Sequence, residues 1–128
     1  VEEVLAASIL NYRDMLQEFI APFQTIVISA PLPTIKDGQD WGEIANERKS
    51  IEASQKQRTD LTIQFNHLMT EYCQLKGMAN LNLDEASIGE YGVLKTSLLN
   101  SDVNDHHYDP ITYSDMLIKK LSTLLINN

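Results

Sequence analysis

Two short apolar stretches decide the fold: Thr25-Ile-Val-Ile-Ser-Ala30 and Met78-Ala-Asn-Leu-Asn-Leu-Asp84. The first is β-branched and apolar at successive positions, which is typical of a strand buried on both faces of a parallel sheet. Between them, Glu43 to Lys76 contain no Pro or Gly, so we expect one long helix that Gly77 ends. Two strands separated by such a helix are parallel and joined by a right-handed crossover. The sequence therefore predicts an α/β fold with a doubly wound parallel sheet.

Helical patterns flank this unit on both sides. In residues 1–20 apolar side chains recur at steps of three and four, and Pro22 ends the pattern. A second amphipathic helix is expected from Pro110 to Leu125, because proline suits the first helical turn. The stretch from Pro33 to Gly42 has turn residues and no period, so we expect an exposed loop there. A single helical turn is expected within Leu94 to Leu99.

The predicted sheet is too small to be complete. Two strands alone are not stable, and sheets of this kind usually contain about five or six strands. The sequence also opens at Val1 inside an amphipathic pattern with no capping residue before it. We therefore expect residues 1–128 to be a single α/β domain, the C-terminal portion of a longer one whose N-terminal strands are missing from this chain. An exposed sheet edge would then favour association between chains.

The composition is that of a globular, acidic protein. The 128 residues are 43% apolar and 22% charged, and 18 acidic against 10 basic residues give a net charge of −8. This charge opposes binding to a phosphate backbone, so no nucleic-acid partner is expected. No apolar run approaches the roughly 20 residues of a membrane-spanning helix. The single cysteine, Cys73, forms no intrachain disulfide and leaves the cellular compartment open.

One loop concentrates the residues that can do chemistry: Asp102-Val-Asn-Asp-His-His-Tyr-Asp109. It places three carboxylates and two imidazoles directly before a helix, and loops at the carboxyl ends of parallel strands are where doubly wound folds bind ligands. A histidine whose tautomer is fixed by a carboxylate can act as a general base. Composition alone favours a solvated polar loop, with a base and a metal site as the alternatives.

The order of the elements and this last block resemble the C-terminal half of an SGNH (GDSL-type) hydrolase. In that family the block is Asp-x-x-His, followed by a short polar stretch and often Gly-Tyr. The segment His107-Tyr-Asp-Pro-Ile-Thr-Tyr113 is similar to it, with Thr112 in the glycine place. The resemblance implies a flavodoxin-like three-layer α/β/α fold. It also implies a serine ester hydrolase, acting on a small-molecule or carbohydrate ester, with no metal and no organic cofactor.

Two departures from the family pattern affect the site. The residue three before His107 is Asn104, so the acidic partner is Asp105 or Asp102, unless the register shifts to His106. The Gly-Asp-Ser nucleophile block, the oxyanion glycine and the Gly-x-Asn-Asp block are absent, so the resemblance implies that upstream sequence supplies the serine. The candidate catalytic residues are His107, Asp105, His106 and Asp102. The alternative is a non-catalytic α/β binding or interaction module whose Asp/His loop binds a divalent cation or is solvated.

Other reactive residues are expected in structural roles. Ser29 lies at a strand end without a Gly-x-Ser-x-Gly pattern and is interpreted as a structural serine. We expect His67 at the surface and Cys73 as a buried, unreactive thiol. Trp41 is interpreted either as a cover over a cleft or as a surface anchor. A solvated helix face is expected for the basic residues Arg48, Lys49, Lys56 and Arg58. The alternative for Arg58 is to orient a substrate or to pair with an acidic loop.

Overall fold

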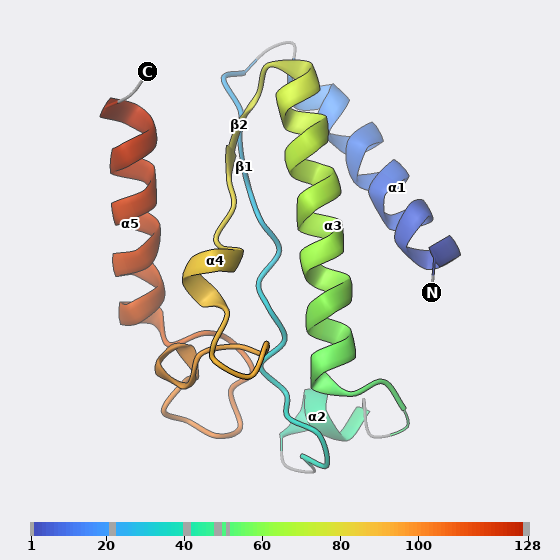
Figure 1. The fold of residues 1–128 in the computed structure, drawn as a ribbon, viewed down its shortest axis with the longest axis vertical. Helices are drawn as coiled ribbons and strands as arrows, with labels where there is room; N and C mark the ends of the chain where they lie inside the picture. The colour runs from blue at the N-terminus through green and yellow to red at the C-terminus, as the bar shows by residue number, and fades with distance from the viewer. Residues whose placement is uncertain (1, 21–22, 40–41, 48–49, 51, 127–128) are drawn as a thin grey trace.

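The computed structural model is a mixed α/β fold, mostly helical, with one small sheet (Figure 1). It describes residues 2–20, 23–39, 42–47, 50 and 52–126. The elements, in chain order, are α1 (Glu2–Ile20), β1 (Ile26–Ile28), α2 (Glu43–Glu47), α3 (Gln55–Lys76), β2 (Ala79–Leu81), α4 (Asp84–Ser87), the 3₁₀ helix η1 (Thr96–Leu98) and α5 (Pro110–Ile126). In Figure 1 the strands lie between α5 and α3, with α1 on the far side of α3.

The predicted parallel pairing of the two strands is confirmed. β1 and β2 pair in parallel, with Ile26 opposite Ala79 and Ile28 opposite Leu81. The described residues add no further strand to this sheet. The predictions for α1, α5 and the single turn at η1 are also confirmed. The larger doubly wound sheet stays a prediction.

The prediction of one continuous helix from Glu43 to Lys76 is wrong, because α2 and α3 are separate helices and residues 52–54 between them are not helical. Ser54 caps α3: its hydroxyl accepts a hydrogen bond from the Gln57 N–H at 3.1 Å, and the Gln57 side chain accepts one from the Ser54 N–H at 2.8 Å. This capping box satisfies backbone donors that a helix start leaves free. Gly77 ends α3 in the left-handed conformation, as predicted.

The first hydrophobic core joins α1, α3 and β1. Its fully buried members are Leu16, Val27, Met69, Tyr72 and Cys73. They come from the apolar stripes of the two helices and from the inward face of β1, so helical spacing explains which side chains meet. Cys73 is fully buried, and burial raises the pKa of its thiol. The predicted burial of Cys73 is therefore confirmed, and its lack of reactivity stays a prediction.

A second core lies beyond the carboxyl end of β1. Leu32, Leu94 and Leu98 are buried there, and Tyr108 and Met116 pack against them. This core brings the segment after β1 against η1 and against the beginning of α5. It therefore determines where the Asp/His loop lies relative to the sheet.

The predicted exposed loop from Pro33 to Gly42 is only partly exposed. Ile35 is buried, and the side chain of Gln55 donates a hydrogen bond to the Pro33 carbonyl at 2.9 Å. Arg58 donates to the Ile35 carbonyl at 2.8 Å, and its guanidinium lies 3.6 Å from Asp37. The loop is thus bound to the beginning of α3, because side chains on the helix satisfy its carbonyl groups.

The ends of both strands are linked to α3 by one buried amide. Asn66 accepts a hydrogen bond from the Ala30 N–H at 2.8 Å and donates to the Ala30 carbonyl at 2.9 Å. The same amide donates to the Asp84 carboxylate at 2.7 Å. Burial raises the pKa of Asp84, and hydrogen bonds from Asn66 and Asn82 act against this shift. The Ser29 hydroxyl completes the link by accepting a hydrogen bond from the Leu83 N–H at 2.9 Å.

One face of the sheet is less covered than predicted. Val27 is buried, whereas Ile26 and Ile28 on the opposite face remain 36% and 39% exposed. None of the described residues of α5 is fully buried, although the helix is amphipathic. Among the described helices, none is apolar enough over the length that a bilayer crossing requires.

We predict that this 128-residue chain self-associates through the open face of β1. Replacing both Ile26 and Ile28 with Thr should reduce association, because Thr keeps the β-branched shape and removes apolar surface. Sedimentation velocity over a range of concentrations measures the effect, and Val103→Thr at an exposed loop position is the control. A parent chain that stays monomeric at every concentration would contradict the prediction.

Candidate functional site

The loop before α5 is organised by a series of tight turns. Asn100 accepts a hydrogen bond from the Asp102 N–H at 3.0 Å, and Asp102 accepts one from the Asn104 N–H at 2.9 Å. Asp105 accepts one from the His107 N–H at 2.8 Å. Each side chain binds the backbone two residues ahead, which is the usual turn role of Asn and Asp. The polar composition therefore specifies a folded loop.

Tyr108 and Thr34 fasten this loop to the segment that follows β1. The Tyr108 hydroxyl accepts a hydrogen bond from the buried Leu32 N–H at 2.6 Å, and burial raises the pKa of Tyr108 to about 12. The Thr34 hydroxyl donates to the His106 carbonyl at 2.6 Å. The Tyr108 ring also contacts the Tyr113 ring edge-on, at 5.6 Å between centroids. The backbone on which both histidines lie is thus fixed at two points.

Asp109 caps α5 and is not part of the Asp/His cluster. Its carboxylate accepts hydrogen bonds from the Thr112 N–H at 2.9 Å and from the Thr112 hydroxyl at 2.7 Å. The N–H bond is the larger cause of the lowered pKa of Asp109. Pro110 occupies the first helical turn, as predicted.

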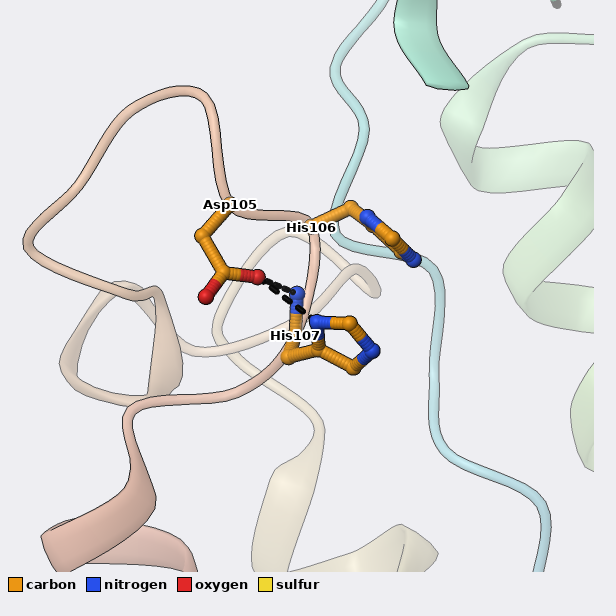
Figure 2. Close-up of side chains that lie close together, drawn as sticks. All are labelled: Asp105, His106 and His107. Carbon is orange, nitrogen blue, oxygen red and sulfur yellow. Dashed lines mark hydrogen bonds and ion pairs between the residues drawn. The ribbon is translucent and has the colours of Figure 1, made fainter. Parts of the chain in front are cut away.

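Asp105 and His107 form a directly bonded pair. The Nδ1 atom of His107 lies 2.7 Å from Oδ1 of Asp105, and Asn100 donates a hydrogen bond to Oδ2 of the same carboxylate at 3.0 Å. The His107 backbone N–H and then the His107 imidazole lower the pKa of Asp105. In Figure 2 the second ring nitrogen of His107, Nε2, points away from Asp105. The side chain of His107 is 75% exposed, so this nitrogen is accessible.

The structure brings three of the four candidate residues together. The His106 and His107 rings lie 4.2 Å apart between centroids, and Asp105 lies beside them (Figure 2). The Asp102 carboxylate instead binds the backbone of Asn104, and no bond joins it to either imidazole among the described residues. Geometry therefore selects Asp105 as the carboxylate partner. The catalytic roles of these residues stay predictions.

A cleft of about 600 Å³ lies in front of the two histidines, at the carboxyl end of β1. Its lining includes Pro33, Thr34, Thr62, His106, His107 and Tyr113. The hydroxyls of Thr34 and Thr62 are both bonded to backbone carbonyls. No serine hydroxyl of the described residues is bonded to either imidazole.

The other residues singled out in the sequence have structural contacts. Ser29 is bonded to the backbone of Leu83, as expected for a structural serine. The side chain of His67 is 70% exposed and lies 3.4 Å from Glu71, one turn further along α3. Both interpretations are confirmed. Trp41 lies outside the described residues.

The solvated face predicted for the basic residues is confirmed only in part. Lys56 pairs with Asp60 at the surface of α3. Arg58 differs, because its side chain is only 19% exposed and it binds the loop at Ile35 and Asp37. The structure therefore agrees with the alternative prediction for Arg58, which is pairing with an acidic residue of this loop, Asp37. Arg48 and Lys49 lie outside the described residues.

Two residues that organise the site were not singled out from the sequence. Asn100 is one of several Asn and Asp residues in a polar run, and nothing in their order marks the one that binds Asp105. Tyr108 follows the two histidines, but its partner Leu32 is far away in the sequence. No local pattern predicts either contact.

Comparison with known proteins returned no family model, curated protein or solved structure that matches this chain.

We predict that Tyr108→Phe lowers the free energy of unfolding by about 1 to 3 kcal/mol, because the buried Leu32 N–H loses its acceptor. Chemical denaturation followed by circular dichroism measures the change. Tyr91→Phe is the matched control, since Tyr91 is exposed. Equal stability of the two variants would show that the Tyr108 hydroxyl does not fasten the loop.

We also predict that His107→Ala raises the pKa of Asp105 only part of the way to its ordinary value. The backbone N–H of residue 107 remains in this variant, and it is the larger cause of the lowered pKa. Because the folded pKa lies below the unfolded one, the pair stabilises the protein above the unfolded pKa, and this contribution is lost as the pH falls through the folded pKa. Carboxyl ¹³C NMR titration measures the pKa of Asp105 in both proteins. An Asp105 pKa that is unchanged in His107→Ala would contradict the imidazole contact.

Proposed function

We propose that Asp105 and His107 are the carboxylate and the histidine of the catalytic triad in a serine ester hydrolase of the SGNH type. The serine nucleophile in this proposal comes from sequence outside these 128 residues. One observation carries the proposal: the 2.7 Å contact between His107 Nδ1 and Asp105 Oδ1 leaves Nε2 free and exposed. A carboxylate on Nδ1 is the arrangement that fixes the tautomer of a catalytic histidine.

The proposed mechanism uses the two nitrogens of His107 differently. Nδ1 carries its proton toward Asp105, so the lone pair is on Nε2. As the serine oxygen attacks the acyl carbon, Nε2 accepts the serine proton, and it later gives that proton to the leaving alcohol. The Asp105 carboxylate stabilises the imidazolium that forms between these steps. Asn100 keeps the carboxylate oriented through its other oxygen.

The fold supports the same proposal at a coarser level. A parallel strand pair with α3 on one side and α5 on the other is compatible with part of a three-layer, doubly wound sheet (Figure 1). In the proposal, strands from outside this chain complete the sheet. The cleft before the histidines combines apolar and hydroxyl-bearing side chains, which suits a small-molecule or carbohydrate ester. The mechanism requires no cofactor.

We predict that His107→Ala lowers the rate of aryl-ester hydrolysis by a factor of about 10² to 10⁴, the usual contribution of a positioned base. The measurement uses a protein that includes both this chain and the sequence proposed to supply the serine. His67→Ala is the matched control, because His67 is exposed on α3 far from the loop in sequence. Asp105→Asn should lower the rate, whereas Asp102→Asn should leave it nearly unchanged, because Asp102 does not contact the imidazole.

Two results would contradict the proposal in different ways. If His106→Ala abolishes hydrolysis and His107→Ala does not, the base is the neighbouring histidine. If a serine-directed covalent probe labels the 128-residue chain stoichiometrically, the nucleophile lies within this chain.

A further inference from the structure

The proposed base mechanism leaves His106 without a role, although its ring faces the cleft beside His107. Asp105, His106 and His107 each offer one ligand atom, and these atoms all lie within 4.8 Å of one another. The three residues are consecutive, and all come from the loop that Thr34 and Tyr108 fasten to the segment after β1.

We infer that Asp105, His106 and His107 form a binding site for a divalent transition-metal ion of the Zn²⁺ class. Two imidazole nitrogens and one carboxylate oxygen are a usual protein ligand set for zinc with one position left open. The same set is a poor one for Mg²⁺ or Ca²⁺, which require oxygen ligands. The inference concerns metal binding and does not depend on the proposed hydrolase activity.

The three ligand atoms must move closer together to close around an ion. Zinc–nitrogen and zinc–oxygen bonds are about 2.0 to 2.2 Å long. Ligand atoms bound to one zinc ion therefore lie closer to one another than the 4.8 Å limit within which these three atoms lie. The His107 side chain is 75% exposed and the Asp105 side chain 39% exposed, so both have room to rotate. Meanwhile the backbone is held on both sides of His107, because Thr34 binds the His106 carbonyl and Tyr108 binds the Leu32 N–H.

The charge of the chain also favours a cation at this site. The net charge is −8, and Asp102 lies on the same loop as the three ligands.

Isothermal titration of the 128-residue chain with zinc chloride alone tests the inference. We expect one Zn²⁺ per chain, with no comparable binding of Mg²⁺. His106→Gln should weaken zinc binding by a factor of about ten or more, because the loss of a metal ligand costs at least as much as the loss of its supporting hydrogen bond. His67→Gln is the matched control, because His67 and Glu71 form an exposed pair outside the proposed site. It measures how much zinc binds nonspecifically to surface side chains.

Three outcomes would overturn the inference: no zinc binding, equal binding of Mg²⁺, or weakening by His67→Gln without weakening by His106→Gln. Circular dichroism of each variant excludes unfolding as the cause of a lost signal. A second measurement, the zinc-induced shift of the His106 and His107 ring resonances in NMR, locates the ion directly. None of these measurements uses ester hydrolysis, so failure of the metal site and failure of the hydrolase proposal are distinguishable.

Discussion

The buried amide of Asn66 is the interaction on which the arrangement of the sheet and its loops depends. It satisfies both backbone groups of Ala30, just after β1, and one oxygen of Asp84, just after β2. Without it, both backbone groups of Ala30 would lose their partners, and the Asp84 carboxylate would keep only its hydrogen bond from Asn82. Because Asn66 lies on α3, the helix that connects the two strands also fixes where both of their loops begin.

The Asp/His loop depends on this arrangement through the segment that follows β1. Leu32 packs in the second core and donates its N–H to Tyr108, and Thr34 binds the backbone of His106. The site is thus built from two segments about 70 residues apart in the sequence. The local turns shape the loop, but only these long-range bonds place its histidines beside a cleft.

The two proposals make different use of one side chain. As a base, His107 needs the lone pair of Nε2 free while Asp105 holds the proton on Nδ1. As a metal ligand, the same histidine contributes a nitrogen lone pair to the ion. A zinc ion bound through Nε2 would therefore block proton transfer, and the two roles exclude each other at any one moment. His106 separates the two proposals, because it belongs to the proposed metal site and not to the proposed base pair.

The sequence by itself determined the parallel strand pair, the helices α1 and α5 and the position of the Asp/His loop, because hydrophobic period, β-branched runs, Gly77 and Pro110 act over short distances. The sequence also contains a signal for the break between α2 and α3, because Ser54 and Gln57 have the spacing of a capping box. The absence of Pro and Gly favours one continuous helix instead. Only the tertiary structure decided which carboxylate serves His107. Asp105 and Asp102 are equivalent in composition, and both form local turns, but only Asp105 contacts the His107 imidazole. The bonds from Leu32 to Tyr108 and from Thr34 to His106 then place this turn beside the cleft. The two long-range bonds leave no periodic trace in the sequence, because their partners lie more than 70 residues apart and are brought together only by the fold.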